Sequence, residues 1–165
     1  MNIFYLSSDP ETAAQMACDK HVIKMILETA QLLYTAQHLS DNNLYDCPYQ
    51  PYKVAHKNHP SAIWARSSMD QYNWLCQLGL AYCDEYKFRY GYDKEHSSHK
   101  HLIWLYNNPP GLDYDGFIDP PQCMPNQYKD YDDCIQAYRN YYIGEKLPFA
   151  KYTVREVPYW LEDYF

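Results

Sequence analysis

Residues 19–39 read DKHVIKMILETAQLLYTAQHL and show the three- and four-residue period of an amphipathic helix. One face of this helix is apolar and consists of Val22, Ile23, Met25, Ile26, Thr29, Leu32, Leu33 and Ala36. A second row with the same spacing is polar and consists of His21, Lys24, Glu28, Gln31, Thr35 and His38. Because this row places imidazole, ammonium, carboxylate and amide groups beside a core-facing stripe, it predicts that the helix lines a site in an all-helical domain.

The size and composition of the chain indicate one domain with an aromatic core. A chain of 165 residues is long enough to bury a core and short enough to form a single domain. It contains twenty Tyr, four Trp and only five Gly. Tyrosine supplies apolar area and a hydroxyl, so most of these rings should fill the core, and some could stack on a flat ligand. The aromatic segment 147–165 is too apolar to remain free in solvent and should pack on the domain.

Capping residues and prolines mark the predicted helix boundaries. Asp9 and Pro10 begin a short first helix, because an acidic N-cap followed by proline suits the first turn. Segments 40–60 and 107–128 are rich in Asp, Asn or Pro, which predicts long ordered loops. The chain is therefore predicted to be one compact all-α domain, residues 1–165, with five to six helices. The further helices are expected at about 60–69, 71–90, 94–106 and 132–143.

The charge of the chain limits the ligands that it can bind. The formal net charge is −7 and the isoelectric point is near 5.4. Proteins that bind duplex DNA gain affinity by neutralising phosphates and are usually basic, so a long DNA footprint is disfavoured. A local basic cleft would suit a small anionic ligand or a short stretch of strand.

The six cysteines and the N-terminus predict a cytoplasmic protein. The cysteines are scattered rather than arranged as a dense framework, which favours free thiols in a reducing compartment. The N-terminal stretch MNIFYLSSDP lacks the basic region and apolar run of a signal peptide. No stretch has the apolar length that spans a bilayer. The cytoplasm of a host cell is expected if a phage encodes the chain, and a homodimer is left open.

Glu28 is the first candidate for chemistry. It lies in the middle of the predicted helix beside the apolar face, where partial loss of hydration would suit a proton-transfer group. His21 and Lys24 could orient it or bind phosphate, and Gln31 lies on its other side. The alternative is an exposed glutamate that pairs with Lys24 one turn away.

Two further clusters of polar residues could bind an anion. The segment 53–60 ends at a proline that begins a helix, so its N–H groups and the helix dipole favour an anion. It also provides Lys53, His56, Lys57, Asn58 and His59, although the last two could serve only as helix caps. Arg139 in the stretch YRNYY could clamp a phosphate or simply point outward from an aromatic packing face.

Metal binding is a rival interpretation of some of these residues. Cys18-x-x-His21, His56-x-x-His59 and the run from His96 through His99 to His101 have spacings that ligands can adopt. The paired Cys-x-x-Cys pattern of zinc sites does not occur. We therefore expect no metal and no cofactor.

Several short motifs occur along the chain: His21 and Glu28 on one helix, Asn58-His59-Pro60 at a helix start, Asp84-Glu85 before Arg89-Tyr90-Gly91, and the stretch 138–142. Together they resemble the motifs of the pyrimidine-dimer DNA glycosylase family. The chain resembles more closely a group of short phage proteins of unassigned role that share DKHV-KM-E-AQLL, HKNHP and FAK-T-REVP.

The resemblance implies a compact all-α fold and cleavage of an N-glycosidic bond. In that family an N-terminal α-amine attacks the sugar C1′ and a glutamate of the long helix handles protons. Glu28 matches this glutamate and His21 the histidine before it. The family's arginines beside the glutamate are absent, since Leu27 precedes Glu28 and the first arginine is Arg66.

The predicted function is therefore that of an enzyme that cleaves an N-glycosidic bond in a nucleotide or nucleic acid, with DNA repair as one setting. The second residue is Asn2, whose size usually prevents removal of Met1. Because the Schiff-base lyase step of the family uses the amine exposed by that removal, a hydrolytic mechanism through Glu28 is favoured over it. One alternative is an anti-defence protein that cleaves or sequesters a cyclic or other small nucleotide immune signal. Another is a non-catalytic module that binds nucleotides or a protein.

Overall fold

The computed structural model describes residues 1–41 and 44–165, and every regular element in this part of the chain is helical. The predicted all-α fold is confirmed. The α-helices are α1 (Pro10–Met16), α2 (Asp19–His38), α3 (Pro60–Ala65), α4 (Met69–Tyr90), α5 (His99–Asn107) and α6 (Cys134–Tyr141). Shorter turns are 3₁₀ elements at Leu44–Asp46, Asn126–Tyr128 and Glu162–Tyr164 and a π-helical turn at Tyr142–Lys146.

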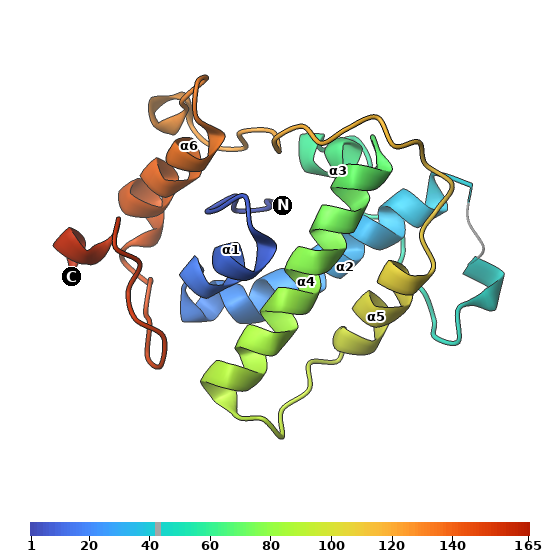
Figure 1. Ribbon diagram of the computed structural model, residues 1–165, viewed down its shortest axis with the longest axis horizontal. Coiled ribbons are helices and arrows are strands. Elements are labelled where there is room, and N and C mark those ends of the chain that lie inside the picture. The colour runs from blue at the N-terminus through green and yellow to red at the C-terminus, as the bar shows by residue number, and fades with distance from the viewer. Residues whose placement is uncertain (42–43) are drawn as a thin grey trace.

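The two long helices α2 and α4 cross in the middle of the molecule (Figure 1). Helix α1 packs on α4, α5 packs on α4 and α2, and α3 packs on both long helices. Gly79 of α4 lies at a close approach, because a Cβ there would meet Leu102 Cδ2 of α5 at 2.8 Å and Thr29 Cγ2 of α2 at 3.0 Å. The absence of a side chain at this position therefore allows three helices to meet.

Helix α2 buries the apolar face that its period predicts, with one exception. Val22, Ile26, Leu32 and Leu33 are fully buried. Ile23 is 38% exposed, so its assignment to the core face was wrong. The residues of the polar row differ in burial: His21 and Thr35 are buried, whereas Lys24 and His38 are exposed.

Several helix boundaries differ from the predicted ones because other residues serve as caps. Ser68 accepts a hydrogen bond from the backbone of Gln71 at 3.3 Å, so α4 begins at Met69 rather than at residue 71, and α3 ends at Ala65 rather than at residue 69. Helix α5 begins at His99 rather than near residue 94. Ahead of it, the backbone N–H of Ser98 donates to the side chain of His96, and such a local bond competes with helix formation.

The segment between α5 and α6 is an irregular strap that runs across the molecule above α3 and α4 in Figure 1. Trp64 Nε1 donates to the carbonyl of Ile118 at 2.9 Å, and the backbone of Gly116 donates to Asp70 Oδ2 at 3.0 Å. These bonds attach the strap to α3 and to the start of α4, so the predicted long loop holds a defined course.

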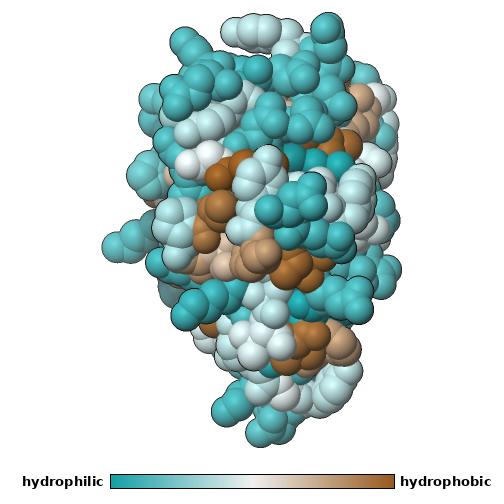
Figure 2. All heavy atoms as spheres, turned by 90° about the vertical axis from the view of Figure 1, so that its left-hand side faces the viewer, coloured by the Kyte–Doolittle hydropathy of each residue, from teal (hydrophilic) through white to brown (hydrophobic). Residues whose placement is uncertain are grey.

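The C-terminal segment packs against α1, α4 and α6. Tyr152 Oη donates to the carbonyl of Met16 at 2.6 Å, and Arg155 pairs with Glu85 of α4. Figure 2 views the molecule from the side where α6 and this segment lie, and there apolar side chains interrupt a mostly hydrophilic surface across its middle. The expectation that this segment packs on the domain agrees with these contacts.

Candidate functional site

A polar cavity of about 330 Å³ opens where the N-terminal arm, α2, the start of α3 and the π-helical turn meet. Two residues of the polar row of α2, Lys24 and Glu28, line it together with His59. The other lining residues come from distant parts of the chain: Met1, Asn2, Phe4, Cys123, Tyr141 and Lys146.

Lys24 and Glu28 lie one helical turn apart on α2 and share the cavity. Such a spacing usually lets an ammonium and a carboxylate pair on a helix surface. Within the described residues, neither group takes part in an ion pair. The exposed Lys24–Glu28 pair considered as an alternative is therefore not formed, and both charges remain available to a ligand.

The N-terminal arm is bent so that its first residues enter the cavity. Asn2 Oδ1 accepts hydrogen bonds from the backbone of Ile3 at 2.7 Å and of Phe4 at 3.3 Å, and Asn2 Nδ2 donates to the carbonyl of Cys123 at 2.9 Å. Phe4 has a φ of 55°, a conformation that costs a non-glycine residue about 1–3 kcal/mol. The surrounding contacts must offset this cost, and they place Met1 and Asn2 at the cavity wall.

His21 lies beneath the cavity rather than in it. Its ring stacks on Phe4 with centroids 4.3 Å apart, and Nδ1 is 2.6 Å from Tyr142 Oη. Burial, followed by the ammonium groups of Lys146, Lys24 and Lys20, lowers the pKa of His21 to about 3. Its imidazole is therefore neutral near pH 7 and supports Phe4, and it does not line the cavity where it was expected to orient Glu28 or bind phosphate.

His59 is the N-cap of α3, where its Nδ1 accepts a hydrogen bond from the backbone of Ser61 at 3.1 Å. Burial, the Met1 amino group and His56 lower its pKa. A neutral imidazole that accepts through Nδ1 carries its proton on Nε2. His59 can therefore cap the helix and also donate a hydrogen bond through its other nitrogen.

Lys146 is a site residue that the sequence motifs did not single out. It ends the π-helical turn, and its ammonium lies 4.5 Å from the ring centroid of Tyr141 and 5.8 Å from that of Phe4. Turns of this kind often occur at functional sites. Lys146 follows the last predicted helix, so no helical pattern in the sequence indicated that it belongs to a site. The π-helical turn places its ammonium over these rings.

The other predicted binding residues do not line this cavity. Gln31 is half-buried on α2, and His56, Lys57 and Asn58 are exposed in the loop before α3. Lys53 lines a separate hollow that also includes His38 and Tyr45. None of these residues therefore shares the cavity with Glu28.

Arg139 serves the packing of α6 instead of a phosphate. Its Nε and Nη2 donate to the carbonyl of Leu6 at 3.2 and 3.0 Å, and Nη1 donates to Tyr159 Oη at 3.0 Å. The guanidinium also lies 5.3 Å from the ring centroid of Trp160. Arg139 therefore packs within the protein, whereas the alternative to a phosphate clamp expected it to point outward.

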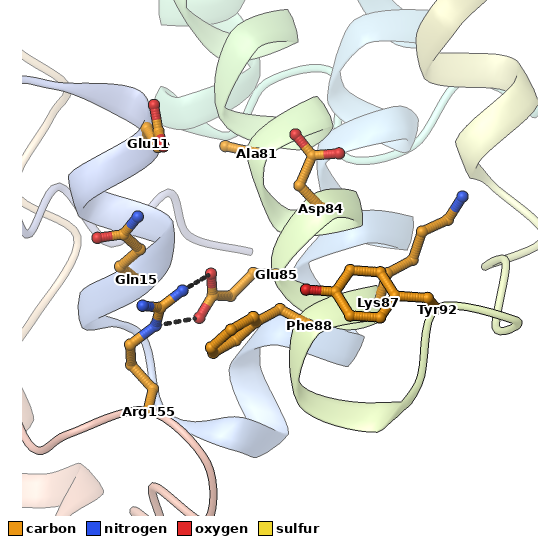
Figure 3. Close-up of a pocket in the computed structure, with 9 residues that line it drawn as sticks. All are labelled: Glu11, Gln15, Ala81, Asp84, Glu85, Lys87, Phe88, Tyr92 and Arg155. Carbon is orange, nitrogen blue, oxygen red and sulfur yellow. Dashed lines mark hydrogen bonds and ion pairs between the residues drawn. The ribbon is translucent and has the colours of Figure 1, made fainter.

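A second cavity of about 350 Å³ lies between α1, α4 and the C-terminal segment (Figure 3). In it the guanidinium of Arg155 faces the carboxylate of Glu85, with bonds of 2.9 and 3.0 Å, and lies 4.1 Å from the ring centroid of Phe88. Glu85 also accepts from Arg89 at 2.8 Å. Because Glu85 is held by two arginines, whereas Glu28 takes part in no ion pair among the described residues, the cavity at Glu28 is the stronger functional candidate although it is slightly smaller.

The structure offers no cluster for a metal among the residues that it describes, since no three His, Cys, Asp or Glu side chains gather there. In the same part of the chain, no helix is long and apolar enough to span a membrane. The chain matches no family model, no curated protein and no solved structure.

The cavity at Glu28 combines groups that could bind and process an anionic ligand. Lys24 and Lys146 supply positive charge, Glu28 supplies a carboxylate and His59 supplies a neutral donor. At about 330 Å³ the cavity falls at the lower end of the roughly 300–1,000 Å³ typical of small-molecule sites. One nucleotide, free or turned out of a strand, is a ligand of suitable size and charge.

Proposed function

We propose that the protein cleaves an N-glycosidic bond in a nucleotide or nucleic acid and that Glu28 is its catalytic carboxylate. The observation that carries this proposal is the arrangement of Glu28, which shares a cavity with two lysines and His59 but pairs with neither lysine. A carboxylate beside an anion-binding region suits a reaction in which positive charge develops on a sugar.

In the proposed reaction a water molecule attacks C1′ of the sugar. The bond between the water oxygen and C1′ forms while the C1′–N bond to the base breaks. Glu28 takes the proton from the water and stabilises the oxocarbenium-like sugar electrostatically. The electron pair of the broken bond leaves with the base, and the Nε2–H of the neutral His59 donates a hydrogen bond that stabilises the negative charge on the base. The base then takes a proton from solvent, and Glu28 releases the proton of the attacking water to solvent.

The test of this proposal is base release by wild type and by a Glu28→Gln variant. The substrates are nucleoside monophosphates, cyclic nucleotides and DNA that contains pyrimidine dimers, with free base measured by chromatography, in the case of the DNA after photoreversal of the dimers. Abasic DNA, which has no base to release at its lesion, serves as the blank. We expect the variant to bind the substrate while losing at least about a hundredfold in rate, the scale of general acid–base catalysis. Glu156→Gln, an exposed change in the C-terminal segment, should leave the rate unchanged.

A second candidate function is capture of a small nucleotide without catalysis. Two lysines that pair with no carboxylate of the described residues, together with the nucleotide-sized volume of the cavity, favour it, because capture requires only binding. In a phage-encoded protein, such capture would remove an immune signal of the host. If wild type binds a nucleotide but releases base from none of the substrates, this second function replaces the first.

A further inference from the structure

The lysines of the cavity form a local cluster of positive charge on a protein whose net charge is −7. Lys24 and Lys146 line the cavity, and Lys20 lies nearby, with its ammonium 4.8 Å from the ring centroid of Phe149. All three act on the same buried imidazole of His21. The positive charge is therefore concentrated around one point of an otherwise acidic molecule.

Aromatic rings hold Lys146 in place. Its ammonium lies over the ring of Tyr141 at 4.5 Å, with Phe4 and Phe149 at 5.8 and 6.0 Å. Contacts of this kind attract a cation without neutralising its charge. A ligand phosphate would then meet an ammonium group that is already positioned, which reduces the entropy lost on binding.

The arginines, in contrast, are engaged within the protein. A duplex binder needs many cations along its surface, because each phosphate that it neutralises adds to its affinity. All four arginines already donate hydrogen bonds to acceptors of the chain: Arg66 to Lys57, Arg89 to Ala14, Gln15, Ala17, Asp19 and Glu85, Arg139 to Leu6 and Tyr159, and Arg155 to Glu85.

We infer that the site takes a free nucleotide rather than duplex DNA and that Lys24 and Lys146 hold its phosphate. This inference rests on the proposed function for the nucleotide nature of the ligand. The two lysines match the one or two negative charges of a single phosphate. The acidic remainder of the molecule repels the continuous backbone charge of a duplex.

Titration calorimetry with adenosine 5′-monophosphate, adenosine 3′,5′-cyclic monophosphate, adenosine, inorganic phosphate and a short DNA duplex tests this inference, with the same set for the other three bases. We expect at least one monophosphate, linear or cyclic, to bind about tenfold more tightly than its nucleoside. The linear and cyclic forms distinguish a terminal phosphate from a phosphodiester.

Variants identify the phosphate site. Lys146→Ala and Lys24→Ala should each remove most of the preference for the monophosphate over the nucleoside, and Lys146→Arg should retain it. The matched control is Lys100→Ala, because Lys100 also lies over a ring, that of Tyr49 at 4.9 Å, but on α5 outside the cavity. Thermal denaturation confirms that each variant folds.

Several results would overturn the inference: equal binding of nucleoside and monophosphate, no binding of any probe, tightest binding to the duplex with a steep salt dependence, or an equal loss in Lys100→Ala. Failure of the proposed function looks different. Lysine-dependent binding of a monophosphate without base release would refute the enzyme and support this inference. Base release from DNA alone would support the enzyme and refute this inference.

Discussion

His21 should make the stability of the protein depend on pH. In the folded protein, burial and nearby lysines lower its pKa from 6.5 to about 3, so the imidazole stays neutral where the unfolded chain binds a proton. The unfolded state therefore binds more protons between pH 6.5 and 3, and stability falls as the pH is lowered through this range. A full proton contributes about 1.4 kcal/mol per pH unit.

Urea denaturation at a series of pH values below 6.5 measures this effect. The free energy of unfolding should fall less steeply with decreasing pH in His21→Gln than in wild type. His56→Asn serves as the control, because His56 is exposed and its φ of 50° is one that asparagine tolerates. Equal slopes for wild type and His21→Gln would contradict the assignment.

Gly144 is required by a close approach within the π-helical turn. A Cβ at this position would lie 2.2 Å from Tyr128 Cε1 and 2.6 Å from its hydroxyl. We expect Gly144→Ala to destabilise the protein by about 1–3 kcal/mol, measured by denaturation, because the ring or the turn must move. Adding Tyr128→Ser should restore part of the loss.

The matched control for this prediction is Gly111→Ala, where the nearest atom to a new Cβ is 3.4 Å away. That distance is an ordinary contact, so the change should cost less than Gly144→Ala. If Gly144→Ala also weakens nucleotide binding, the turn that carries Lys146 and the cavity are coupled. Equal costs for the two glycines would refute the steric explanation.

The C-terminal segment is joined to α4 by a buried carboxylate. Glu85 is 4% exposed and accepts hydrogen bonds from both Arg89 and Arg155. Removing one partner of a buried charge network typically costs about 3–5 kcal/mol, because it leaves a desolvated charge without compensation. We expect Glu85→Gln to cost about 3 kcal/mol in thermal or urea denaturation, and the exposed neighbour Asp84→Asn to cost little. Similar losses of stability in the two variants would show that the Glu85 network does not stabilise the fold more than an exposed carboxylate does.

Two elements without a regular α-helical period complete the candidate site. The N-terminal arm brings Asn2 and Phe4 against α2 through the strained turn at Phe4, and the π-helical turn brings Lys146 over the same ring. Both elements also contact His21, whose ring stacks on Phe4 and whose Nδ1 bonds Tyr142. Helix α2 thus lines the cavity with Lys24 and Glu28 and supports two of the other elements around it through His21.

The molecule is built around α2 and α4, and its local stability should follow this arrangement. The middle of each helix consists largely of fully buried residues, whereas the strap between α5 and α6 is mostly exposed. Slow amide exchange is expected where opening requires global unfolding. Hydrogen-exchange mass spectrometry should therefore find the slowest peptides at 30–36 and 75–83, and fast exchange over much of 111–119. Fast exchange in α2 would contradict this view of the core.

The all-α architecture and the core face of α2 could be predicted from the chain, because an apolar period of three and four residues is a local property. Lys24, Glu28 and His59 could also be nominated, since a polar row on a helix and a proline-marked helix start are visible in a few adjacent residues. The ends of the helices were harder to predict from the sequence. Ser68 and His96 compete with other capping residues only a few positions away, so the choice depends on tertiary contacts.

The tertiary structure decided which of these candidate residues line the cavity, and it added residues that the sequence had not indicated. It separated Arg139 from the cavity, because the carbonyl of Leu6, distant in the chain, occupies its guanidinium. It also brought Met1, Cys123 and Lys146 to the cavity from positions far apart in the sequence. Periodicity reports which residues share the face of one helix. Convergence of separate segments depends on how helices, turns and straps pack, and that packing is a property of the whole chain.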